Sequence, residues 1–522
     1  MTDAATTSPA RVARLSHVAR SSLLIGVLFG IDKGLGLLRQ VVVGRQFGVS
    51  AELDAFNAAN NLPDLLFALI SGGALAIAFI PVLSQVLERQ GRQAAWDLFS
   101  RVANWAFLIT GAAAILLAVF AGPLVRAELG VAPGFTPQLQ SLVADLMRLD
   151  LIATLIFSIS GLVIAGLQAN QHFFLPALAP AVFDLGQIFG ALVLAPEVGY
   201  PLGSLQLPAA GLGVHGLVYG AILGAALHLG VQVPGLIRYR FHWRPRLGVN
   251  HPGLRQVARL MGPRILTIGA FNLVFVVQDN LASRLNLGSV TALTYGWLIM
   301  QVPETILGTA IGTALLPTLA EHFARGDNRA FEDSVARGMR VLLSLSLPMA
   351  GVLAVCLRPL IQGVFDFEPR GTELVVWAAR AYLLGLVGHS LLELAARAFY
   401  ARQNARVPML AAALGTAVFI TLGSLLYRPL GATGIGLSNS LAFSLQTFLL
   451  LVLLSRSFPS VLRQGQPALR GLLGTALGAL AAWTVLQALP ASLLLGGLAA
   501  LMVGGAVSLP FIGPELRELV RL

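Results

Sequence analysis

The sequence predicts an all-α polytopic membrane protein of about fourteen transmembrane helices. It is 56% hydrophobic and only 11% charged, whereas about a quarter of the residues in an ordinary soluble domain are charged. Apolar segments recur from Ser21 to Ile512, each of about 20 residues, the length at which a helix crosses roughly 30 Å of hydrocarbon. The segments lack the alternation of apolar and polar residues that is typical of a transmembrane β-barrel.

The first apolar segment follows a polar stretch, residues 1–20, that contains three arginines, and this apolar segment has no A-x-A-like exit and continues into a long helix. We therefore expect a cytoplasmic N-terminal segment and not a cleaved signal peptide. The apolar segments that we interpret as spans are 21–46, 56–85, 102–127, 141–168, 173–196, 208–237, 256–284, 289–318, 338–365, 374–400, 407–427, 432–455, 471–489 and 491–512.

Arginines concentrate in every second loop of this arrangement. The loops that would face the cytoplasm hold most of them, and the opposite loops hold chiefly Arg370 and Arg428. Basic residues favour cytoplasmic loops, so the bias predicts that both termini lie inside. It also accounts for the net charge of +11 without nucleic acid as a partner. The arginines of the predicted cytoplasmic loops are Arg89, Arg92, Arg101, Arg238, Arg240, Arg244, Arg246, Arg325, Arg329, Arg337, Arg402, Arg406, Arg456, Arg463 and Arg470.

A basic segment divides the chain nearly in half and predicts two lobes. We interpret 238–255 as a cytoplasmic linker that lies along anionic lipid headgroups, where each basic residue gains about 1 kcal/mol. The predicted parts are the N-terminal segment 1–20, an N-lobe 21–237, the linker, a C-lobe 256–455, a cytoplasmic loop 456–470, two further helices in 471–513 and a tail 514–522.

The two halves also resemble each other in sequence. Each contains an arginine, a Gly-containing turn, a helix with a mid-span proline, a Gly-rich stretch and a second proline; these prolines are Pro63 and Pro81 in one half, and Pro303 and Pro317 in the other. The copies are six helices apart, so they share one orientation, which predicts lobes related by an axis along the membrane normal, as in alternating-access transporters. An accidental match between two apolar helix pairs is the alternative.

The first span contains an unusual set of charges, in GVLFGIDKGLGLLRQVVVGRQFG at residues 26–48. Lys33 is the only lysine of the chain. A charge at the bilayer centre costs about 2.5–3.5 kcal/mol and persists mainly in a bundle interior or a wet cavity. Asp32 and Arg39 are seven residues apart and so share a helix face. One interpretation is a structural ion pair in which Asp32 neutralises Lys33 or Arg39.

The other interpretation is a cationic cavity between the lobes for a phosphate-bearing headgroup. Arginine binds phosphate oxygens in a bidentate manner, whereas lysine acts as a point charge. Neighbouring glycines would let the helix bend or unwind towards a ligand. The proposed substrate-binding residues are Lys33, Arg39, Asp32, Asp54 and Arg45, although Arg45 and Asp54 are equally compatible with a structural role at an interface.

Further intramembrane charges are candidates for cavity lining or proton coupling. Arg148 and Asp145, with Asp150 nearby, predict either an ion-pair cluster or a substrate contact. Asp184, Asp279 and Glu304 are isolated carboxylates that we consider as proton sites. His389 and Glu393 are one helical turn apart, which predicts either a proton relay or a simple pair on one helix face.

Enzymatic chemistry has little support in the sequence. The single cysteine, Cys356, lies in an apolar run, so we predict no disulfide and no cysteine-based metal site. No Walker A sequence, nucleophile elbow or HExxH is present. We therefore predict a protein that is not an enzyme and that needs no cofactor and no metal.

Three stretches resemble the MurJ/MviN lipid II flippases of the multidrug/oligosaccharidyl-lipid/polysaccharide exporter superfamily. The first is GLLRQVVVGRQFG…AELDAFNAANNLPDLL…GGALAIAFIPVLSQ, similar to the first two helices of the family. The second is MGPRILTIGAFNLVFVVQDNLASRLNLGSV…VPETILGTAIGTALLPTLAEHFARGD, and the third is AARAFYARQNARVPM…RPLGATGIGLSNSLAF. The resemblance implies a flippase that moves lipid II, the undecaprenyl-diphosphate-linked peptidoglycan precursor, from the inner to the outer leaflet.

The resemblance also implies site residues, and here the sequence departs from the family. Two essential arginines of the first helix correspond to Lys33 and Arg39, and Asp54 matches. Arginines expected in the second and eighth helices correspond to Phe67 and Leu298. Two of the four cations expected on the substrate side are therefore absent.

Some family members also have a cation site, which this sequence matches poorly. Its carboxylate corresponds to Gln278, with Asp279 adjacent, and its polar pair to Phe419 and Gly423. Sodium coupling therefore cannot be transferred to this chain. By resemblance the last two helices form a groove for the lipid tail, whereas close packing of their small residues requires no groove.

These patterns predict a bacterial cytoplasmic-membrane transporter with a lipid-linked precursor, membrane lipids and cell-wall synthesis proteins as its partners. The alternatives are an exporter of another lipid-linked glycan or of amphipathic drugs, which the residues at 67 and 298 favour, and a transport-inactive envelope scaffold. Long soluble insertions would favour a scaffold, and the sequence has none.

Overall fold

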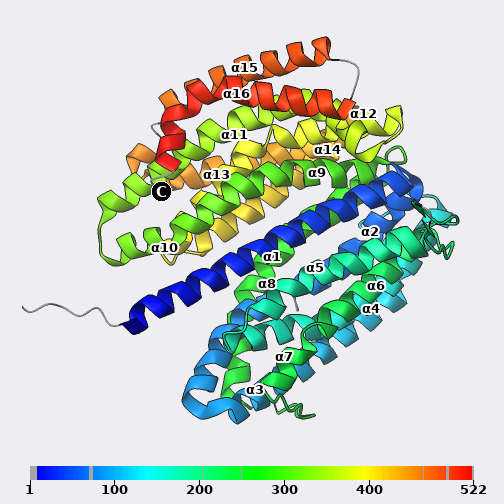
Figure 1. Cartoon of the computed structure of the whole chain (residues 1–522), viewed down its shortest axis with the longest axis vertical. Helices are drawn as coiled ribbons and strands as arrows, with labels where there is room; N and C mark the ends of the chain where they lie inside the picture. The colour runs from blue at the N-terminus through cyan, green and yellow to red at the C-terminus, as the bar shows by residue number, and fades with distance from the viewer. Residues whose placement is uncertain are drawn as a thin grey trace, which may run out of the picture. The chain divides into compact units, whose positions relative to one another are not determined.

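The computed structural model describes residues 9–69, 74–203, 205–248, 250–462, 464–489 and 493–519 (Figure 1). Its elements, in chain order, are α1 (Pro9–Phe47), α2 (Ala51–Phe67), α3 (Ala74–Arg126), α4 (Pro137–Ala169), α5 (Phe174–Phe189), η2 (Gly190–Leu194), β1 (Pro201–Leu202), β2 (Leu205–Gln206), α6 (Val214–Gly230), α7 (Val233–Arg238), α8 (Pro252–Ala282), α9 (Ser289–Glu304), η3 (Thr305–Thr309), α10 (Ala310–Ala324), α11 (Asn328–Phe365), α12 (Pro369–Leu383), α13 (Leu386–Ala401), α14 (Arg406–Ser455), η4 (Pro459–Leu462), α15 (Gly465–Ala488) and α16 (Leu493–Leu519).

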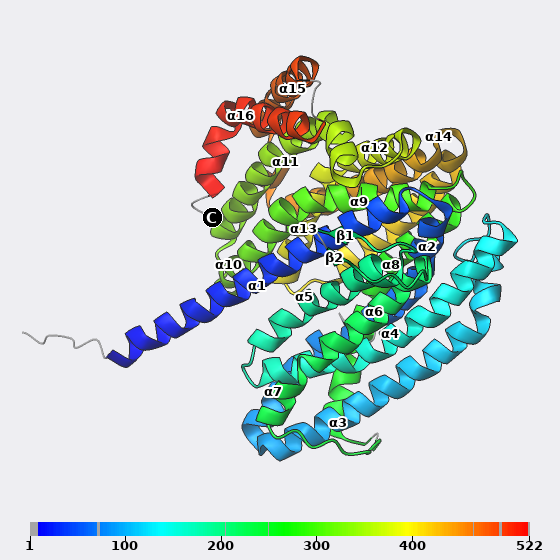
Figure 2. The ribbon, with the colours of Figure 1, turned by 45° about the vertical axis from the view of Figure 1, so that its right-hand side comes forward.

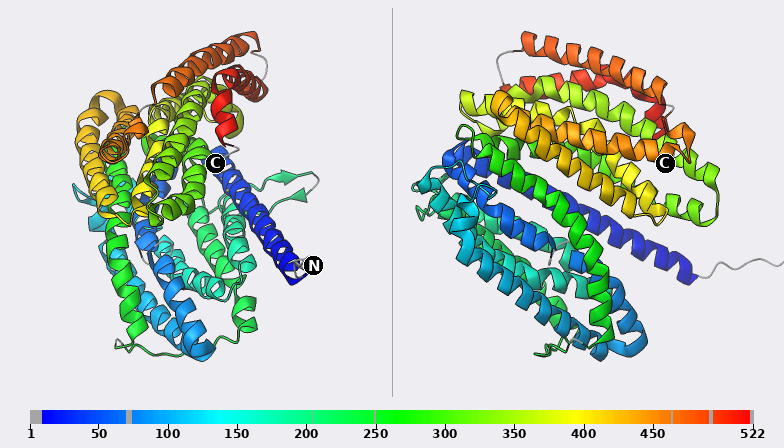
Figure 3. Two further views of the ribbon diagram at one scale, coloured as in Figure 1. Left: turned by 90° about the vertical axis from the view of Figure 1, so that its left-hand side faces the viewer. Right: turned by 180° about the vertical axis from the view of Figure 1, so that it is seen from behind.

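The described chain is therefore almost entirely helical, as predicted, with one departure. The short strands β1 and β2 pair in an antiparallel hairpin, Pro201 opposite Gln206, which projects from the helices of its own unit (Figure 3). The hairpin lies in the loop between η2 and α6, where Gly203 has a positive φ of 65°. Glycine adopts this conformation without steric cost, so a tight turn forms there.

The chain forms two compact units. The first comprises Met1–Gln46, Leu62–Ala121 and Ala144–Ile268, and the second comprises Phe47–Asn61, Gly122–Val143 and Gly269–Leu522. Two short segments of the first half, 47–61 and 122–143, thus pack within the second unit. Specific contacts hold the second of these segments, because the Asn280 side-chain amide donates hydrogen bonds to the carbonyls of Glu128 and Gly130.

The core of the first unit forms between the two arms of α3 and α4. Helix α3 is kinked at Gly91, where φ is 83° and ψ is 177° (Figure 2). Phe79 and Phe99, one from each arm, have ring centroids 5.9 Å apart, and both belong to the buried cluster that includes Leu162 of α4. Burial of these apolar side chains fixes the arms of α3 against α4.

The second unit contains a larger helical core and the C-terminal pair α15 and α16. Phe331, Leu342 and Leu394 are fully buried in the main cluster. Helices α15 and α16 pack on α11 (Figure 1), and a Cβ added to Gly478 would lie 2.6 Å from the carbonyl oxygen of Gly504. Small residues here allow close helix packing.

Within the described residues, nine helices are long and apolar enough to cross a membrane, or ten if α12 and α13, bent by 42°, count as one span. The predicted number of fourteen is not confirmed. Of the nine, α14 contains the two predicted spans 407–427 and 432–455, and α3 contains the end of 56–85 and nearly all of 102–127. The two parts join at Gly431 in α14 and at Gly91 in α3, where the backbone is not helical. Helix α1 is not among the nine, and it contains Asp32, Lys33 and Arg39.

Candidate functional site

The cations of α1 form two ion pairs, and the Lys33 side chain is more exposed than that of Arg39. Lys33 Nζ lies 3.3 Å from Asp32, and the Lys33 side chain is 63% exposed whereas that of Asp32 is 14% exposed. The ammonium also lies 5.0 Å from the centroid of the Phe29 ring. The predicted neutralisation of Lys33 by Asp32 therefore occurs, but it leaves most of the ammonium accessible to a ligand.

Arg39 is held by α5, and not by Asp32 as one interpretation predicted. Its guanidinium lies 3.2 Å from Asp184, whose side chain is only 9% exposed, and it donates a hydrogen bond to Gln187. A Cβ added to Gly36 would lie 3.3 Å from the Asp184 carboxylate, so this glycine gives the carboxylate room beside α1. The structure thus brings together Arg39 and Asp184, two residues that the sequence placed in separate candidate sites.

The glycines of α1 do not interrupt the helix, which is continuous from Pro9 to Phe47. The predicted bend or unwinding is therefore not present in this structure. A Cβ added to Gly30 or Gly34 would meet no atom within 4 Å. The helix surface beside Lys33 is consequently open.

Asp54 serves as the cap of another helix. Its carboxylate accepts hydrogen bonds from the backbone amides of Gly288 at 2.6 Å and Thr291 at 2.7 Å, and the residue is 1% exposed. These amides lie at the N-terminus of α9, where backbone N–H groups lack partners within the helix and the helix dipole favours a negative charge. The geometry supports the structural role that was considered for Asp54. Arg45 lies in the last turn of α1 and is exposed.

The ion pair predicted in the fourth span forms, with both side chains about half exposed. Arg148 Nη1 lies 2.7 Å from Asp145, and the Arg148 Nε also donates to the carbonyl of Ala118 at 3.0 Å. The pair links α4 to the second arm of α3. Its exposure leaves it accessible to either lipid or substrate.

Asp279 and its neighbour Gln278 are buried on α8. Asp279 accepts a hydrogen bond from Asn61, and the Tyr382 hydroxyl donates to Gln278 Oε1 at 2.5 Å. The other two positions of the family's cation site, Phe419 and Gly423, are apolar, and a Cβ on Gly423 would lie 3.0 Å from Leu281. These residues do not fit a sodium ion. Within the described part of the chain, no group of three or more His, Cys, Asp or Glu side chains is arranged to hold a metal.

Glu304 lies where α9 passes into the π-helix η3. Thr309, five residues further on, donates to both oxygens of Glu304 at 3.2 and 3.3 Å, a contact that the π-helical repeat permits. The neighbouring carboxylate Glu393 pairs with Arg397.

His389 and Glu393 do not form the contact that a relay between them requires. His389 instead hydrogen-bonds Asn439 at 3.1 Å. The two residues predicted as a relay or a pair are therefore satisfied separately.

An aromatic cluster stands where the sequence lacks an expected cation. The Phe67 ring centroid lies 5.1 Å from that of Phe157, which in turn lies 5.0 Å from Phe183 and 5.1 Å from His228. In the sequence, Phe67 is noticeable only as a missing arginine. Because its partners come from α4, α5 and α6, no local spacing in the sequence indicates the cluster.

Comparison with known proteins identifies the family. The family model described as "Lipid II flippase MurJ" matches residues 43–512. The lipid II flippase MurJ of Burkholderia cenocepacia is 30% identical over 452 residues, 83% of each chain. The probable lipid II flippase MurJ of Buchnera aphidicola from Acyrthosiphon pisum is 26% identical over 398 residues, 75% of each chain.

Solved structures share the fold. A structure titled "Lipid II flippase MurJ, inward closed conformation" matches with a TM-score of 0.77 at 21% identity, covering 95% of this chain and 100% of the other. An inward-facing multidrug resistance MATE family transporter matches with a TM-score of 0.67 at 13% identity, over 82% and 96% of the two chains. At these identities the likeness shows the fold alone. The family match across most of the chain and the relative at 30% identity establish that this multi-pass membrane protein belongs to the bacterial lipid II flippase MurJ family.

Proposed function

We propose that the chain moves lipid II from the inner to the outer leaflet of the bacterial cytoplasmic membrane by alternating access. The observation that carries this proposal is the accessible ammonium of Lys33 in α1, in a chain whose family is that of lipid II flippases. A cation in an otherwise apolar segment is costly, and a phosphate-bearing headgroup would compensate it.

The two cations of α1 would act differently on the diphosphate. Lys33 is the mobile point charge, weakly held by Asp32, and is free to follow the headgroup. Arg39 is oriented by Asp184 and Gln187, so its remaining N–H donors point in a fixed direction. Both cations have a carboxylate partner, but the Lys33 side chain is 63% exposed and that of Arg39 is 24% exposed, so we expect Lys33 to provide most of the attraction.

Binding of the headgroup would then bias the transporter between its inward and outward states. A ligand shifts such an equilibrium only by the difference in its affinity for the two states. We propose that the contact between Lys33 and the diphosphate is stronger in the state that is closed to the cytoplasm. Transport follows when the headgroup is released outward and the empty transporter returns.

The proposed architecture has fourteen crossings, with two six-helix lobes at 21–237 and 256–455 and both termini in the cytoplasm. The breaks at Gly91 and Gly431 support counting α3 and α14 as two crossings each. The sequence repeat gains support from local structure, because Pro63 and Pro303 both lie inside helices that pass into π-type turns, at 68–69 and in η3.

Asp279 and Glu304 are the carboxylates that we propose for proton coupling. Asp184 and Asp145 are each paired with an arginine. Asp279, in contrast, accepts from the neutral amide of Asn61, and Glu304 accepts from the hydroxyl of Thr309. A carboxylate whose hydrogen-bond partners are neutral can change its protonation state without breaking an ion pair.

Export of a different lipid-linked glycan is the second candidate function. The aromatic cluster at Phe67 favours it, since an apolar surface replaces a cation that the family resemblance implies. The rest of the proposed mechanism would be the same, because the diphosphate carrier would be unchanged. The substrate's sugar and peptide would then differ.

The experiment that separates these functions is rescue of cells depleted of their own lipid II flippase. We expect expression of this chain to restore growth and the outward movement of lipid II. Failure to rescue, with the protein present in the membrane at the level of a working flippase, would contradict the proposal and favour another glycan. A variant with an unrelated exposed cation removed, Arg325→Ala, serves as the matched control and should rescue fully.

A further inference from the structure

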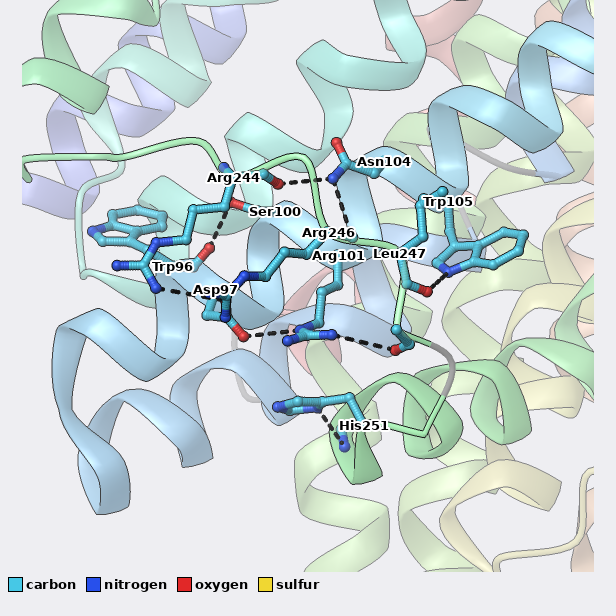
Figure 4. A network of polar contacts seen from close by, with 12 residues as sticks. Trp96, Asp97, Ser100, Arg101, Asn104, Trp105, Arg244, Arg246, Leu247 and His251 are labelled. Carbon is cyan, nitrogen blue, oxygen red and sulfur yellow. Dashed lines mark hydrogen bonds and ion pairs between the residues drawn. The ribbon is translucent and has the colours of Figure 1, made fainter.

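The basic linker forms a strap that is fixed along one helix. We call residues 239–248 the strap; they follow α7 directly and lie against α3 (Figure 4). The strap begins where the candidate membrane span Val214–Arg238 ends. The part of α3 beneath it follows the kink at Gly91 and has several charges, including Arg92, Asp97 and Arg101. Both features place the strap at the boundary of the membrane.

Trp96 and Asn104 on one face of α3, with Trp105 adjacent to Asn104, hold the backbone of the strap. The indole N–H of Trp96 donates to the carbonyl of Tyr239 at 3.1 Å, and that of Trp105 donates to the carbonyl of Leu247 at 2.7 Å. Between them, the Asn104 amide donates to the carbonyls of Arg244 and Arg246 at 2.9 and 3.1 Å. Residues one or two turns apart on a helix share a face, so α3 positions the whole strap.

This arrangement leaves positive charge unneutralised. Asp97 is the carboxylate that the strap faces, and three guanidiniums share it: Arg101 at 2.8 Å, Arg246 at 3.3 Å and Arg244 at 3.9 Å. Arg238 and Arg240 add two more exposed cations. One carboxylate cannot neutralise three arginines, so the surface of the strap remains strongly basic.

An aromatic ring stands exposed within this basic surface. Trp243 is 60% exposed, yet its indole N–H donates to Asn104 Oδ1 at 2.8 Å. The ring is therefore held in one position with its apolar part uncovered. Tryptophan is enriched at the headgroup level of membranes, where one part of the ring contacts lipid and the other remains polar.

We propose that the strap is a binding surface for anionic glycerophospholipid headgroups, with Trp243 inserted at the membrane interface. The lipid phosphates would contact Arg240, Arg244 and Arg246 of the strap and Arg238, which immediately precedes it; Asp97 only partly offsets the charge of Arg244 and Arg246. This interaction concerns bulk membrane lipid and is independent of the proposed transport of lipid II. Each basic residue near an anionic membrane surface strengthens binding about fivefold.

Fluorescence quenching tests the position of Trp243. The full chain is placed in nanodiscs of mixed phosphatidylglycerol and phosphatidylcholine, in which one or the other lipid bears dibrominated acyl chains. The Trp243→Phe variant measures the quenching of the other tryptophans, and subtracting it from the wild-type quenching leaves the part that depends on Trp243. We expect the Trp243-dependent quenching to be greater when phosphatidylglycerol has the bromine atoms than when phosphatidylcholine does. Equal quenching by the two lipids, or none that depends on Trp243, would overturn the proposal.

A charge variant tests the role of the arginines without disturbing the contacts of Asp97. We expect Arg238→Gln combined with Arg240→Gln to reduce the preference for phosphatidylglycerol by about five- to 25-fold. The matched control, Arg325→Gln with Arg329→Gln, removes the same charge elsewhere and should leave the preference unchanged. Asp97→Asn keeps every guanidinium and should retain the preference. Equal loss in the control pair, or no loss in the strap pair, contradicts the assignment.

Discussion

The ion pair between Arg39 and Asp184 gives the sharpest prediction about α1, because both of its side chains are less exposed than those of the pair between Lys33 and Asp32. In Arg39→Ala, Asp184 would remain with a side chain that is only 9% exposed and no guanidinium beside it. Loss of one partner of a buried pair costs about 3–5 kcal/mol. Since the Arg39 side chain is 24% exposed and a stranded carboxyl can take up a proton, we expect a loss of roughly 2–4 kcal/mol.

Lys33→Ala should behave differently. The Lys33 side chain is 63% exposed whereas that of its partner Asp32 is 14% exposed, so solvent screens this pair more than the pair between Arg39 and Asp184, and its loss should cost less. The double variant Arg39→Ala/Asp184→Ala removes both charges and should be more stable than Arg39→Ala alone, with a coupling of about 1–3 kcal/mol.

Thermal unfolding of the purified variants in detergent measures these differences, and lipid II flipping by the same variants measures function. We expect the double variant to regain much of its stability but not its transport, because the guanidinium is still missing. Equal melting temperatures for Lys33→Ala and Arg39→Ala would refute the ion-pair assignment. Wild-type transport by the double variant would exclude Arg39 from the substrate site.

Three further predictions concern other parts of the chain. Asp54→Ala leaves two buried amides at the start of α9 without their charged acceptor and should lower stability by about 2–4 kcal/mol. Glu52→Ala, at an exposed position of α2, the helix that contains Asp54, should not lower it. Equal melting temperatures of the two variants would contradict the role of Asp54 as the cap. Burial, together with the nearby Arg101, lowers the pKa of His251, which accepts from the Gly253 amide at 3.1 Å and lies near Asp97. The neutral His251 ring therefore stabilises the start of α8 at pH values above the ordinary pKa of histidine, and this contribution is lost as the pH falls. Hydrogen exchange of the Gly253 amide, corrected for its intrinsic rate, should accelerate below about pH 6.5 in the wild type but not in His251→Gln. A corrected exchange rate that does not change with pH in the wild type would contradict this. Asp279→Asn preserves an acceptor for Asn61 but cannot carry a proton, so flipping should lose its dependence on an imposed pH gradient; an unchanged dependence would exclude Asp279 as the coupling site.

The fold class was predictable because composition and the length of apolar segments report directly on a bilayer environment. The number of crossings stays a prediction, since it depends on where long helices break. Gly91 and Gly431 interrupt α3 and α14 with positive φ values of 83° and 60°. A single glycine in an apolar sequence does not reveal whether its backbone will be helical.

The candidate cations were predictable, but their partners were not. Lys33 and Arg39 stand out because charges are rare in an apolar segment. The partner of Arg39 comes from α5, and the carboxylate of Asp54 caps α9. Contacts between elements distant in sequence leave no local spacing pattern, so the sequence could show only that each charge needed compensation.

For the strap, the sequence contained one signal besides basic composition, namely the spacing of polar side chains on α3. Its basic composition predicted contact with headgroups, whereas its attachment to α3 was missed. Trp96, Ser100 and Asn104 recur every four residues and so place donors and acceptors on one helix face. The spacing of this polar stripe is visible in the sequence, but the sequence does not show that the linker, more than 130 residues further on, packs against it.

Leaflet exposure of lipid II in cells that depend on this chain alone tests the central claim most directly. The measurement compares the wild type with Lys33→Ala and Lys33→Arg at matched membrane levels. We expect Lys33→Ala to retain its fold but to expose at least ten times less lipid II per unit time, since a charge-assisted contact to phosphate contributes about 1.5–3 kcal/mol, and Lys33→Arg to remain active. Wild-type exposure of lipid II by Lys33→Ala would contradict the account and place the substrate site elsewhere.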